Sequence, residues 1–348
     1  MHIEKILLAL ILCISFNSFS QEKEYEIRTV AFYNVENLFD TINDPKKFDD
    51  DRTPDGKDKY TSKIYWDKID NLSRVLSEIG EEETKTSPAI LGICEVENLS
   101  VIQDLISSKR LRDKDYGIVH YDSPDERGID VALLYRKKYF KLLSERTFTL
   151  FLFRDDGKRD FTRDQLLVSG LLDGELIHLI VNHWPSRSGG EEKSRPNRIA
   201  AAKLNKKIID SLQRVDAKAK IITMGDLNDD PTNQSVAVVL NAQEKKEKVA
   251  ATKGLYNPMA AMYRKGFNTL AYRDGLNLFD QIIFSQPFLE KDYATYCFYK
   301  AGIYNKDYLI TSKGPYKGYP FRSYNYSTYQ DGYSDHFPVY IYLIREKK

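Results

Sequence analysis

Polar side chains follow or interrupt short hydrophobic runs at several points along the chain. Acidic, amide and imidazole groups share these positions, in the segments Asn34-Val35-Glu36, Cys94-Glu95-Val96-Glu97, Asn182-His183-Trp184, Gly225-Asp226-Leu227-Asn228 and Ser334-Asp335-His336. A further pair, Asp280-Gln281, opens a hydrophobic run instead of closing one. Catalytic groups of layered α/β proteins gather at strand ends, so we expect these side chains to meet at one site.

This combination of residue types suits the hydrolysis of phosphate esters. The substrate is anionic, and its transition state places further negative charge on the phosphoryl oxygens and the leaving group, which a divalent cation can neutralise. Mg²⁺ prefers oxygen ligands, and Mn²⁺ or Ca²⁺ are alternatives. The predicted metal ligands are the carboxylates of Glu36, Glu95 and Asp335 and the amide oxygen of Asn34.

The remaining groups suit proton transfer and water activation. Asp226 can accept a proton from the attacking water, and Asn228 can hydrogen-bond the same water or a phosphate oxygen. His183 and His336 can donate to phosphoryl oxygens, or one can act as acid or base near neutral pH. A carboxylate behind an imidazole fixes its tautomer and favours its protonated form, and Asp280 is predicted to serve His336 in this way.

Each motif also has an ordinary structural interpretation. Asn34 and Glu36 are common turn residues, the Asp226 segment resembles a helix cap, and Asp335-His336 is compatible with a surface pair. Glu95 is harder to explain, because a carboxylate within an apolar strand is costly unless a cation or donors compensate it. The joint occurrence of the motifs, which include two of the five histidines, favours an active site.

Several arginines lie near these motifs in the sequence. Arg127 precedes a hydrophobic run, and Arg187, Arg195 and Arg198 follow the His183 motif. Arginine binds phosphate through two parallel hydrogen bonds, so we predict substrate-binding roles for Arg127, Arg187 and Arg198. The alternative is a solvated face or pairing with nearby glutamates. Asp130 is a candidate to orient His183 or an arginine, and Trp184 is expected in the core.

The elements that must position these groups are short strands and amphipathic helices. Length and β-branched content predict strands at Ile27 to Tyr33, Ala89 to Val96, Asp130 to Tyr135, Gln165 to Leu172, Glu175 to Asn182, Lys220 to Met224, Asp280 to Phe284 and Pro338 to Leu343. Asp173-Gly174 predicts a hairpin turn between two of them. Helical periodicity occurs at Lys63 to Ile79, Asn98 to Ser107 and Arg198 to Leu212. The pattern predicts mixed sheets covered by helices in two or more layers.

Two segments depart from this pattern. Asp40 to Tyr60 is polar and predicts a long solvated loop, whose spacing fits no EF-hand calcium site. Tyr293 to Tyr333 contains many tyrosines among Gly, Lys and Pro. We expect an irregular, β-rich insertion whose rings pack on the domain, with an aromatic wall for bases or sugars as the alternative.

The ordered set of motifs resembles the endonuclease/exonuclease/phosphatase superfamily, which includes DNase I-like nucleases, abasic-site endonucleases, sphingomyelinases and inositol-polyphosphate 5-phosphatases. The resemblance runs from Phe32-Tyr33-Asn34-Val35-Glu36-Asn37 to Ser334-Asp335-His336-Phe337-Pro338-Val339, and its Gly-Asp-x-Asn and Ser-Asp-His motifs are highly specific. It implies an α/β (α+β) fold, the four-layer α/β/β/α sandwich of two facing mixed sheets. It also implies Asn34 and Glu95 at the metal, with Glu36 at a position that is acidic only in some members. Asp226 and Asn228 are implied beside the nucleophilic water, and Asp335 and His336 on the metal and phosphate side. His183 corresponds to a phosphate-contacting imidazole of the DNase I and sphingomyelinase branches, where abasic-site endonucleases have tyrosine.

Composition bounds the setting of this chemistry. Lys5, the apolar run Ile6 to Ile14 and Ser18-Phe19-Ser20 predict a signal peptide over residues 1–20, followed by one domain over 21–348. The formal net charge of +1 argues against a dedicated electrostatic nucleic-acid binder. Cys94 and Cys297 are expected to be buried free thiols, with a disulfide as the alternative. No later segment is apolar enough to span a bilayer.

These observations predict an exported, periplasmic or extracellular phosphoesterase that depends on Mg²⁺ or Mn²⁺. The first choice is an endonuclease that hydrolyses phosphodiester bonds of DNA or RNA. The alternative is a phosphodiesterase or phosphatase for phospholipid headgroups or small phosphorylated metabolites. We expect a monomer with a nucleic acid substrate and no stable protein partner. A non-catalytic binding protein that keeps the fold is disfavoured, because no essential group is missing.

Overall fold

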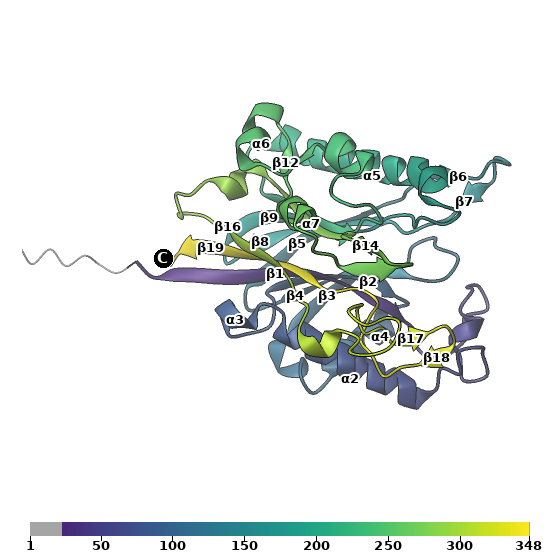
Figure 1. Ribbon diagram of the computed structural model, residues 1–348. Coiled ribbons are helices and arrows are strands. Elements are labelled where there is room, and N and C mark those ends of the chain that lie inside the picture. Colours follow the sequence, from purple (N-terminus) through teal and green to yellow (C-terminus); the bar gives the residue numbers. More distant parts are fainter. Residues whose placement is uncertain (1–22, 348) are drawn as a thin grey trace, which may run out of the picture.

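The computed structural model describes residues 23–347, so the predicted signal peptide lies outside the described residues. Two large mixed sheets face each other (Figure 1). The first has six strands in the order β16-β19-β1-β2-β4-β3. Their bounds are Cys297–Ile303, Val339–Glu346, Tyr25–Leu38, Ile90–Val96, Asp130–Arg136 and Tyr116–His120.

The second sheet has seven strands in the order β11-β12-β15-β10-β9-β8-β5. Their bounds are Ala242–Gln243, Leu255–Tyr256, Asp280–Ser285, Ile221–Asp226, Glu175–His183, Gln165–Leu172 and Phe140–Phe148. The predicted hairpin is confirmed, because β8 and β9 pair antiparallel around Asp173-Gly174. All eight predicted strands are present, and the two large sheets contain five further strands, β3, β5, β11, β12 and β16.

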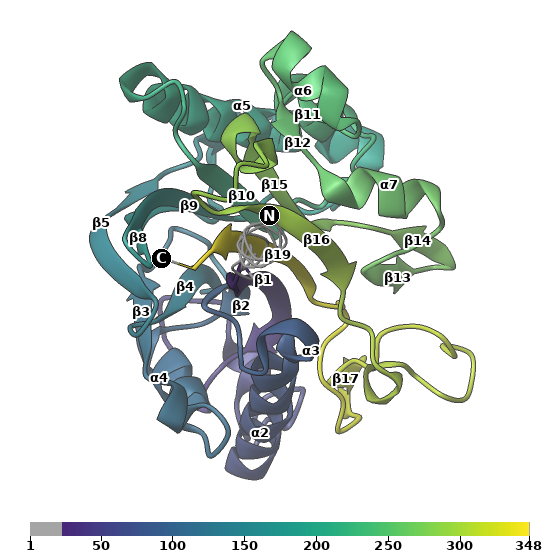
Figure 2. The same ribbon diagram turned by 90° about the vertical axis from the view of Figure 1, so that its left-hand side faces the viewer.

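Helices cover the outer faces of both sheets. Helices α2 (Ser62–Glu78), α3 (Glu81–Thr84) and α4 (Leu99–Ser107) lie on the side of the first sheet, and α5 (Glu191–Val215), α6 (Lys246–Thr252) and α7 (Pro258–Arg264) on the side of the second. Figure 2 looks along the layers, with α5 above the two sheets and α2 below them. The predicted four-layer α/β/β/α sandwich is therefore the observed fold.

Three hydrophobic clusters fill the spaces between these layers. The central one joins Phe32 of the first sheet to Val181 and Met224 of the second. A second packs Ala31 and Tyr33 of β1 against α2 and α4, and a third packs Ile180 of β9 against α5. Neighbouring residues of one strand thus enter different clusters. A strand buried on both faces has no polar side, which explains the continuous hydrophobic runs in the sequence.

Irregular segments and small hairpins complete the chain. The Asp40–Tyr60 segment is a long loop with a single short 3₁₀ helix at Asp50–Arg52. The tyrosine-rich segment contributes β16 and is then mostly irregular, and Tyr304, Tyr324 and Tyr333 pack into the cluster beneath the first sheet, as expected. Three two-stranded hairpins also occur: β6–β7 (Leu152–Phe153, Arg159–Asp160), β13–β14 (Leu270–Tyr272, Gly275–Asn277) and β17–β18 (Tyr324–Asn325, Thr328–Tyr329).

Candidate active site

Strand register places three of the predicted site residues side by side in the second sheet. Strands β9 and β10 are parallel and pair His183 with Asp226, and β10 and β15 are antiparallel and pair Asp226 with Asp280. All three side chains are buried. The row lies at the carboxyl ends of β9 and β10, whose last residues are His183 and Asp226.

The first sheet contributes Asn34 and Glu95 to the same place. Asn34 donates from Nδ2 to Glu95 Oε1 and to Asp226 Oδ2, each at 3.1 Å, so it joins the two sheets. Its Oδ1 accepts the Glu36 backbone N–H at 2.9 Å. The structure therefore shows Asn34 orienting two carboxylates, and its role as a metal ligand stays a prediction.

The backbone around these residues adopts an unusual conformation. Glu36, Asn37, Glu95 and Asn228 have φ between +49° and +65°. Asparagine tolerates the left-handed region, but it is strained for glutamate, and such strain concentrates at functional sites. Glu95 is the extra residue of a bulge between β2 and β4, which turns its side chain toward the strand ends.

Three residues of the specific motifs have structural duties that fix the site. Gly225 cannot carry a side chain, because an added Cβ would lie 2.3 Å from the carbonyl oxygen of Asn182. Ser334 donates to the Asn34 carbonyl oxygen at 2.7 Å and accepts the His336 backbone N–H at 3.1 Å. Asn228 donates its side-chain amide to the Trp184 carbonyl and its backbone N–H to Asp226 Oδ1.

The geometry identifies one group at this edge that fits a divalent cation. Ligand atoms of Glu95, His183 and Asp226 all lie within 4.8 Å of one another. His183 Nε2 is 3.7 Å from Glu95 Oε1 and 3.6 Å from Asp226 Oδ2. Ligands about 2.1 Å from a single ion are separated by roughly 3–4 Å, so the spacing fits. The buried Asp226 and the partly buried Glu95 form no ion pair with an arginine or lysine among residues 23–347, and a cation would stabilise such a pair of carboxylates.

The two site imidazoles are held in opposite protonation states. Burial and the charges of Arg163 and Arg127 lower the pKa of His183 well below its usual value. For His336, burial opposes protonation, but Asp280, whose Oδ2 lies 2.7 Å from Nδ1, raises the pKa well above the usual value. His336 is therefore the charged imidazole, and it has the carboxylate partner that the sequence predicted.

Asp226 lies between these groups and has the properties of a base. Burial raises its pKa to about 7, against the opposing effect of His336, whose Nε2 is 3.9 Å from Asp226 Oδ2. A carboxyl group with a pKa close to neutral can accept a proton from water near physiological pH. The buried atoms His183 Nδ1 and Asp280 Oδ1 have no hydrogen-bond partner within residues 23–347, as expected of polar groups reserved for a ligand or a water.

Two of the three predicted substrate-binding arginines are structural. Arg198 is fully buried, and its guanidinium contacts Asp229 Oδ1 at 2.6 Å and Ser194 Oγ at 2.8 Å. Arg187 binds the Asn228 carbonyl, Asp229 and Asp230. Both brace the loop after β10, so the structure does not support direct substrate contacts for them. Arg127 has a half-exposed side chain paired with Asp125 and remains accessible.

Glu36 and Asp335 lie outside the Glu95 group. Glu36 accepts from the backbone N–H and the hydroxyl of Ser323 at 2.7 and 2.8 Å, and burial, with the charge of Asp335, raises its pKa. Asp335 Oδ2 accepts from Arg322 at 2.7 Å. Arg322 also lies 3.7 Å from Glu36, so the tyrosine-rich segment delivers a cation to the site.

Sequence reasoning missed Arg322, Arg163 and Lys68. Lys68 is buried in α2 and donates from Nζ to the Glu36 carbonyl and to Ser323, and burial lowers its pKa to about 8. Arg163 is buried behind His183 and donates to the His183 and Trp184 carbonyls. None belongs to a motif; the one signal for Lys68 is a lysine on the apolar face of a helix.

The sequence suggested that Asp130 orients His183 or an arginine, but its carboxylate contacts other residues. Its carboxylate accepts from the Ser123 backbone N–H at 2.8 Å and contacts His120 Nε2 at 3.2 Å. Asp125 has the supporting role instead, because it contacts Arg163 at 3.0 Å and Arg127 at 3.2 Å. Trp184 is buried in the core, as expected, and both described cysteines are buried free thiols.

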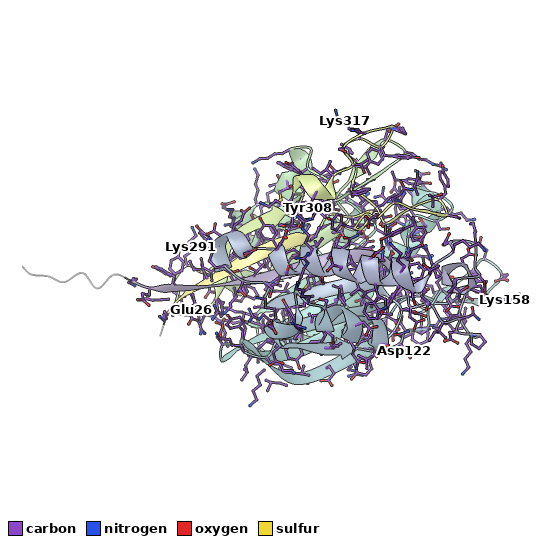
Figure 3. The ribbon with its side chains drawn as sticks, turned by 90° about the horizontal axis from the view of Figure 1, so that it is seen from below. Glu26, Asp122, Lys158, Lys291, Tyr308 and Lys317 are labelled. Carbon is purple, nitrogen blue, oxygen red and sulfur yellow. The ribbon has the colours of Figure 1, made fainter. Side chains whose placement is uncertain are left out.

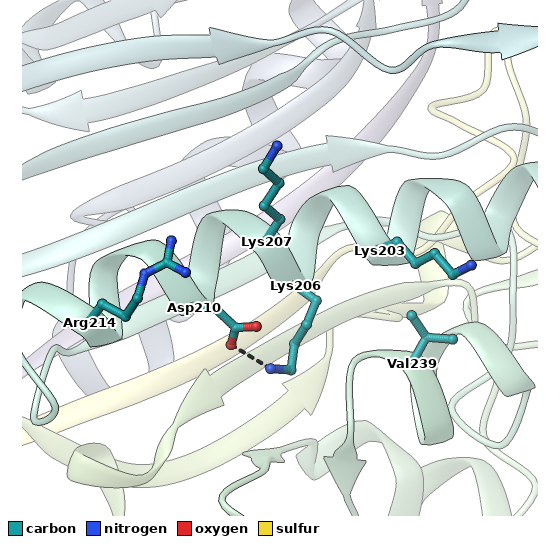
Figure 4. Close-up of a pocket in the computed structure, with 6 residues that line it drawn as sticks. All are labelled: Lys203, Lys206, Lys207, Asp210, Arg214 and Val239. Atoms are coloured by element: carbon teal, nitrogen blue, oxygen red, sulfur yellow. Dashed lines mark hydrogen bonds and ion pairs between the residues drawn. The ribbon is translucent and has the colours of Figure 1, made fainter.

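A basic hollow elsewhere is separate from this site. Lys203, Lys207 and Arg214 line it on the outer surface of α5, beside an ion pair of Lys206 with Asp210 (Figure 4). Lys203 lies 12 residues after the first residue of α5 (203 − 191), about 18 Å along the helix axis. No helix among residues 23–347 has the length and apolar character needed to cross a bilayer.

Comparison with known structures agrees with the fold. A protein of the endonuclease/exonuclease/phosphatase family from Bacteroides thetaiotaomicron is 17% identical, with 93% of this chain and 97% of that chain covered and a TM-score of 0.54. TDP2 from C. elegans is 14% identical, covering 96% and 80%, with a TM-score of 0.56. A mannosyl-6-phosphatase from Bacteroides thetaiotaomicron is 17% identical, covering 91% and 99%, with a TM-score of 0.52.

No match was found among curated proteins. The sequence profile described as Endonuclease/Exonuclease/phosphatase family matches residues 29–345, which includes every predicted site residue from Asn34 to His336. The chain belongs to the endonuclease/exonuclease/phosphatase family.

Proposed function

We propose that this protein is an exported, divalent-metal-dependent phosphodiesterase that cleaves nucleic acid. The observation that carries the proposal is the meeting of Glu95, His183, Asp226 and His336, from four separated segments, at one edge of the sandwich. Export is supported by the Lys5, Ile6 to Ile14 and Ser18-Phe19-Ser20 pattern.

The residues would divide the reaction as follows. Glu95, His183 and Asp226 form the group that would hold Mg²⁺ or Mn²⁺. The bound cation would withdraw charge from the phosphoryl oxygens. Asp226 accepts the proton of the attacking water, and Asn228 keeps that carboxylate oriented through its backbone N–H. The charged His336, fixed by Asp280, donates from Nε2 to a phosphoryl oxygen.

The charges at the site favour a diester over a monoester. Arg127 and Arg322 are each already paired with a carboxylate, Asp125 and Asp335 respectively. The positive charge that these residues leave for the substrate is then that of His336 and of the bound cation, which Glu95 and Asp226 partly neutralise, and this suits the single negative charge of a phosphodiester. A phosphomonoester carries about two charges at neutral pH and would need more free cations. Export would make extracellular nucleic acid, which is a phosphodiester, an available substrate.

The net charge of +1 supports a second candidate, a phosphodiesterase or phosphatase for small metabolites or phospholipid headgroups. Such a substrate does not require a basic surface along a polymer. Salt separates the two candidates, because affinity for a polynucleotide falls steeply with added salt whereas affinity for a small ester changes little.

The test compares substrates with and without metal. The protein is incubated with Mg²⁺, or with EDTA, against single-stranded DNA, duplex DNA, RNA, bis(p-nitrophenyl) phosphate and p-nitrophenyl phosphate. We expect cleavage of nucleic acid and of the diester, dependence on Mg²⁺, and loss of both activities in Asp226→Ala and His336→Ala with the fold retained. Preferential cleavage of the monoester, or full activity in both variants, would overturn the proposal.

A further inference from the structure

The hairpin β6–β7 presents an unusual combination of side chains to solvent. Phe151 and Phe153 are each 64% exposed and Phe161 is 44% exposed, whereas Leu150 and Leu152 are buried. Strand pairing places Phe153 opposite Arg159 and Leu152 opposite Asp160. Alternation along a strand then puts Phe151, Phe153, Arg159 and Phe161 on one outward face. We call these four residues the aromatic face.

Arg159 lies at the centre of the aromatic face. Its guanidinium carbon is 4.0 Å from the ring centre of Phe151 and 5.3 Å from that of Phe161. It donates to the Leu150 carbonyl at 3.2 Å and makes no ion pair within residues 23–347. Its neighbours differ, because Arg154 pairs with Glu126 and Asp160, and Lys158 with Asp156. The aromatic face therefore combines three exposed rings with a partly buried arginine that forms no ion pair in the described part of the chain, although its charge acts on Asp164.

The hairpin adjoins the candidate active site. Phe161 lies two residues before Arg163, so the Cα atoms of these two residues are at most about 7 Å apart. The guanidinium of Arg163 donates to the backbone carbonyls of His183 and Trp184. Arg154 contacts Glu126, the neighbour of Arg127. Lys158, near the tip, lies at the opposite end of the molecule from Glu26 near the start of β1 (Figure 3). The aromatic face thus continues the edge at which the strands deliver their polar groups.

We infer that the aromatic face binds single-stranded nucleic acid by stacking bases on the phenylalanine rings while Arg159 contacts the phosphate backbone. This inference rests on the proposed function and names the form of substrate that the site accepts. Stacking of bases on aromatic side chains is the standard mode of single-strand binding, and arginine adds cation–π and phosphate contacts. Bases paired within a duplex have no free face for such rings.

Two other partners fit the aromatic face less well. Insertion into a membrane would require an apolar tip, but the tip between the strands carries Arg154, Asp155, Asp156 and Lys158. Removing these charges from water is costly. An apolar protein partner would leave the charge of Arg159 buried without a counter-ion. A phosphate between or beside stacked bases satisfies both the rings and the cation.

The test measures binding separately from cleavage. A Phe151→Leu/Phe153→Leu/Phe161→Leu variant keeps apolar surface but loses the aromatic rings, and Tyr25→Ala, an exposed aromatic at the far end of β1, is the matched control. Binding of a fluorescent single-stranded oligonucleotide is followed by anisotropy in proteins that also carry His336→Ala. Circular dichroism verifies the fold of each variant. Cleavage of bis(p-nitrophenyl) phosphate is assayed with His336 intact.

We expect the triple variant to bind the oligonucleotide at least about tenfold more weakly than the parent, as the loss of stacking predicts. The Tyr25→Ala control should bind normally, an abasic oligonucleotide should bind the parent as weakly as the variant, and bis(p-nitrophenyl) phosphate cleavage should be unchanged. Equal binding by parent and triple variant would overturn the inference, as would binding of the parent to phosphatidylglycerol vesicles but not to the oligonucleotide. Intact binding without any diester cleavage would instead contradict the proposed hydrolase activity alone.

Discussion

The Nε2 atoms of His183 and His336 lie 3.6 and 3.9 Å from the same oxygen of Asp226. Their surroundings nevertheless lower the pKa of His183 and raise the pKa of His336. His336 has Asp280 behind it, whereas the Nδ1 of His183 faces no hydrogen-bond partner in the described part of the chain. Asp280 behind His336, and burial with the charges of Arg163 and Arg127 around His183, thus shift the two pKa values in opposite directions. At the scale of single residues, Asp280 has the clearest test.

Asp280→Asn should reduce kcat/KM by at least roughly 100-fold, because the imidazolium of His336 loses its counter-charge and its orientation. The sign with pH follows from the raised pKa of His336. The parent keeps the charged imidazole as pH rises, but the variant loses it at lower pH, so the deficit should grow between about pH 6 and pH 8. A pH profile of bis(p-nitrophenyl) phosphate cleavage measures this. A constant deficit across that range would contradict a role for Asp280 in holding the proton.

Asp125→Asn should destabilise the fold by about 3–5 kcal/mol, because it leaves the buried guanidinium of Arg163 without its carboxylate. Burial opposes ionisation of Asp125, but Arg163 and Arg127 lower its pKa below the usual 3.8. A depressed carboxylate pKa contributes stability above the unfolded value, and this is lost as the pH falls through the folded value.

Urea unfolding of parent and variant at neutral pH and below about pH 3.8 measures this effect. The difference in the free energy of unfolding should shrink at the lower pH. Asp156→Asn, at the exposed hairpin tip, is the control and should change stability little. A difference that is the same at both pH values would show that Asp125 acts through packing.

At the scale of elements, the site depends on exact strand register. His183, Asp226 and Asp280 are cross-strand neighbours, so a slip of one residue in β10 would turn Asp226 to the other face of the sheet. The bulge at Glu95 achieves the converse, because it re-aims one side chain without moving its neighbours out of the two cores.

Gly225→Ala tests this register. The new Cβ would meet the Asn182 carbonyl oxygen at 2.3 Å, so β9 and β10 must separate, at a cost of about 1–3 kcal/mol. We expect a lower unfolding midpoint together with loss of diester cleavage. In Gly157→Ala, at an exposed turn, no atom lies within 4 Å of the added carbon, but the φ of +79° is strained for alanine. This variant should lose about 1–2 kcal/mol of stability and keep full activity. Normal activity in Gly225→Ala would show that the site tolerates displacement of β10.

The strands that sequence reasoning found and missed differ in position. All eight predicted strands lie in the interiors of the two sheets, where burial on both faces produces apolar runs. Among the five strands of these sheets that the sequence does not predict, β3, β5, β11 and β16 are sheet edges, and β12 has only two residues. β5 contains Lys141, Ser144, Glu145 and Arg146 on a largely exposed surface. Edge strands carry charges that discourage aggregation, and those charges hide the hydrophobic periodicity.

At the scale of the whole molecule, the motifs identified the residues that converge but not those that support them. Glu95, Asp226, His183 and His336 could be predicted because each is a polar group in a hydrophobic context. Arg163 could not be predicted, because its role depends on a contact with His183, 20 residues away in the sequence. Arg322 could not be predicted either, because it lies in an irregular loop and contacts the distant Glu36. For the same reason Arg198 was assigned to the substrate although Asp229 binds it in the interior.

Metal binding should stabilise the entire fold, since ligands from both sheets would be joined. At about 100 times its Kd, a bound cation adds about 2.7 kcal/mol to the free energy of unfolding. Mg²⁺ or Mn²⁺ should therefore raise the melting temperature of the parent, and Glu95→Gln should abolish the rise. Glu97→Gln, two residues on and outside the Glu95 group, should retain it. Differential scanning fluorimetry with metal or EDTA measures these shifts, and an equal rise in Glu95→Gln would exclude Glu95 as a ligand.

Asn34 bonds Glu95 within its own sheet and Asp226 across the gap to the other sheet. The thickness of the central core consequently affects catalysis, because it sets the distance between Glu95 on the first sheet and Asp226 on the second. Substituting a smaller side chain for Met224, deep between the sheets, would alter that spacing without touching any reacting group. Selection on the interior of this protein is thus also selection on its chemistry.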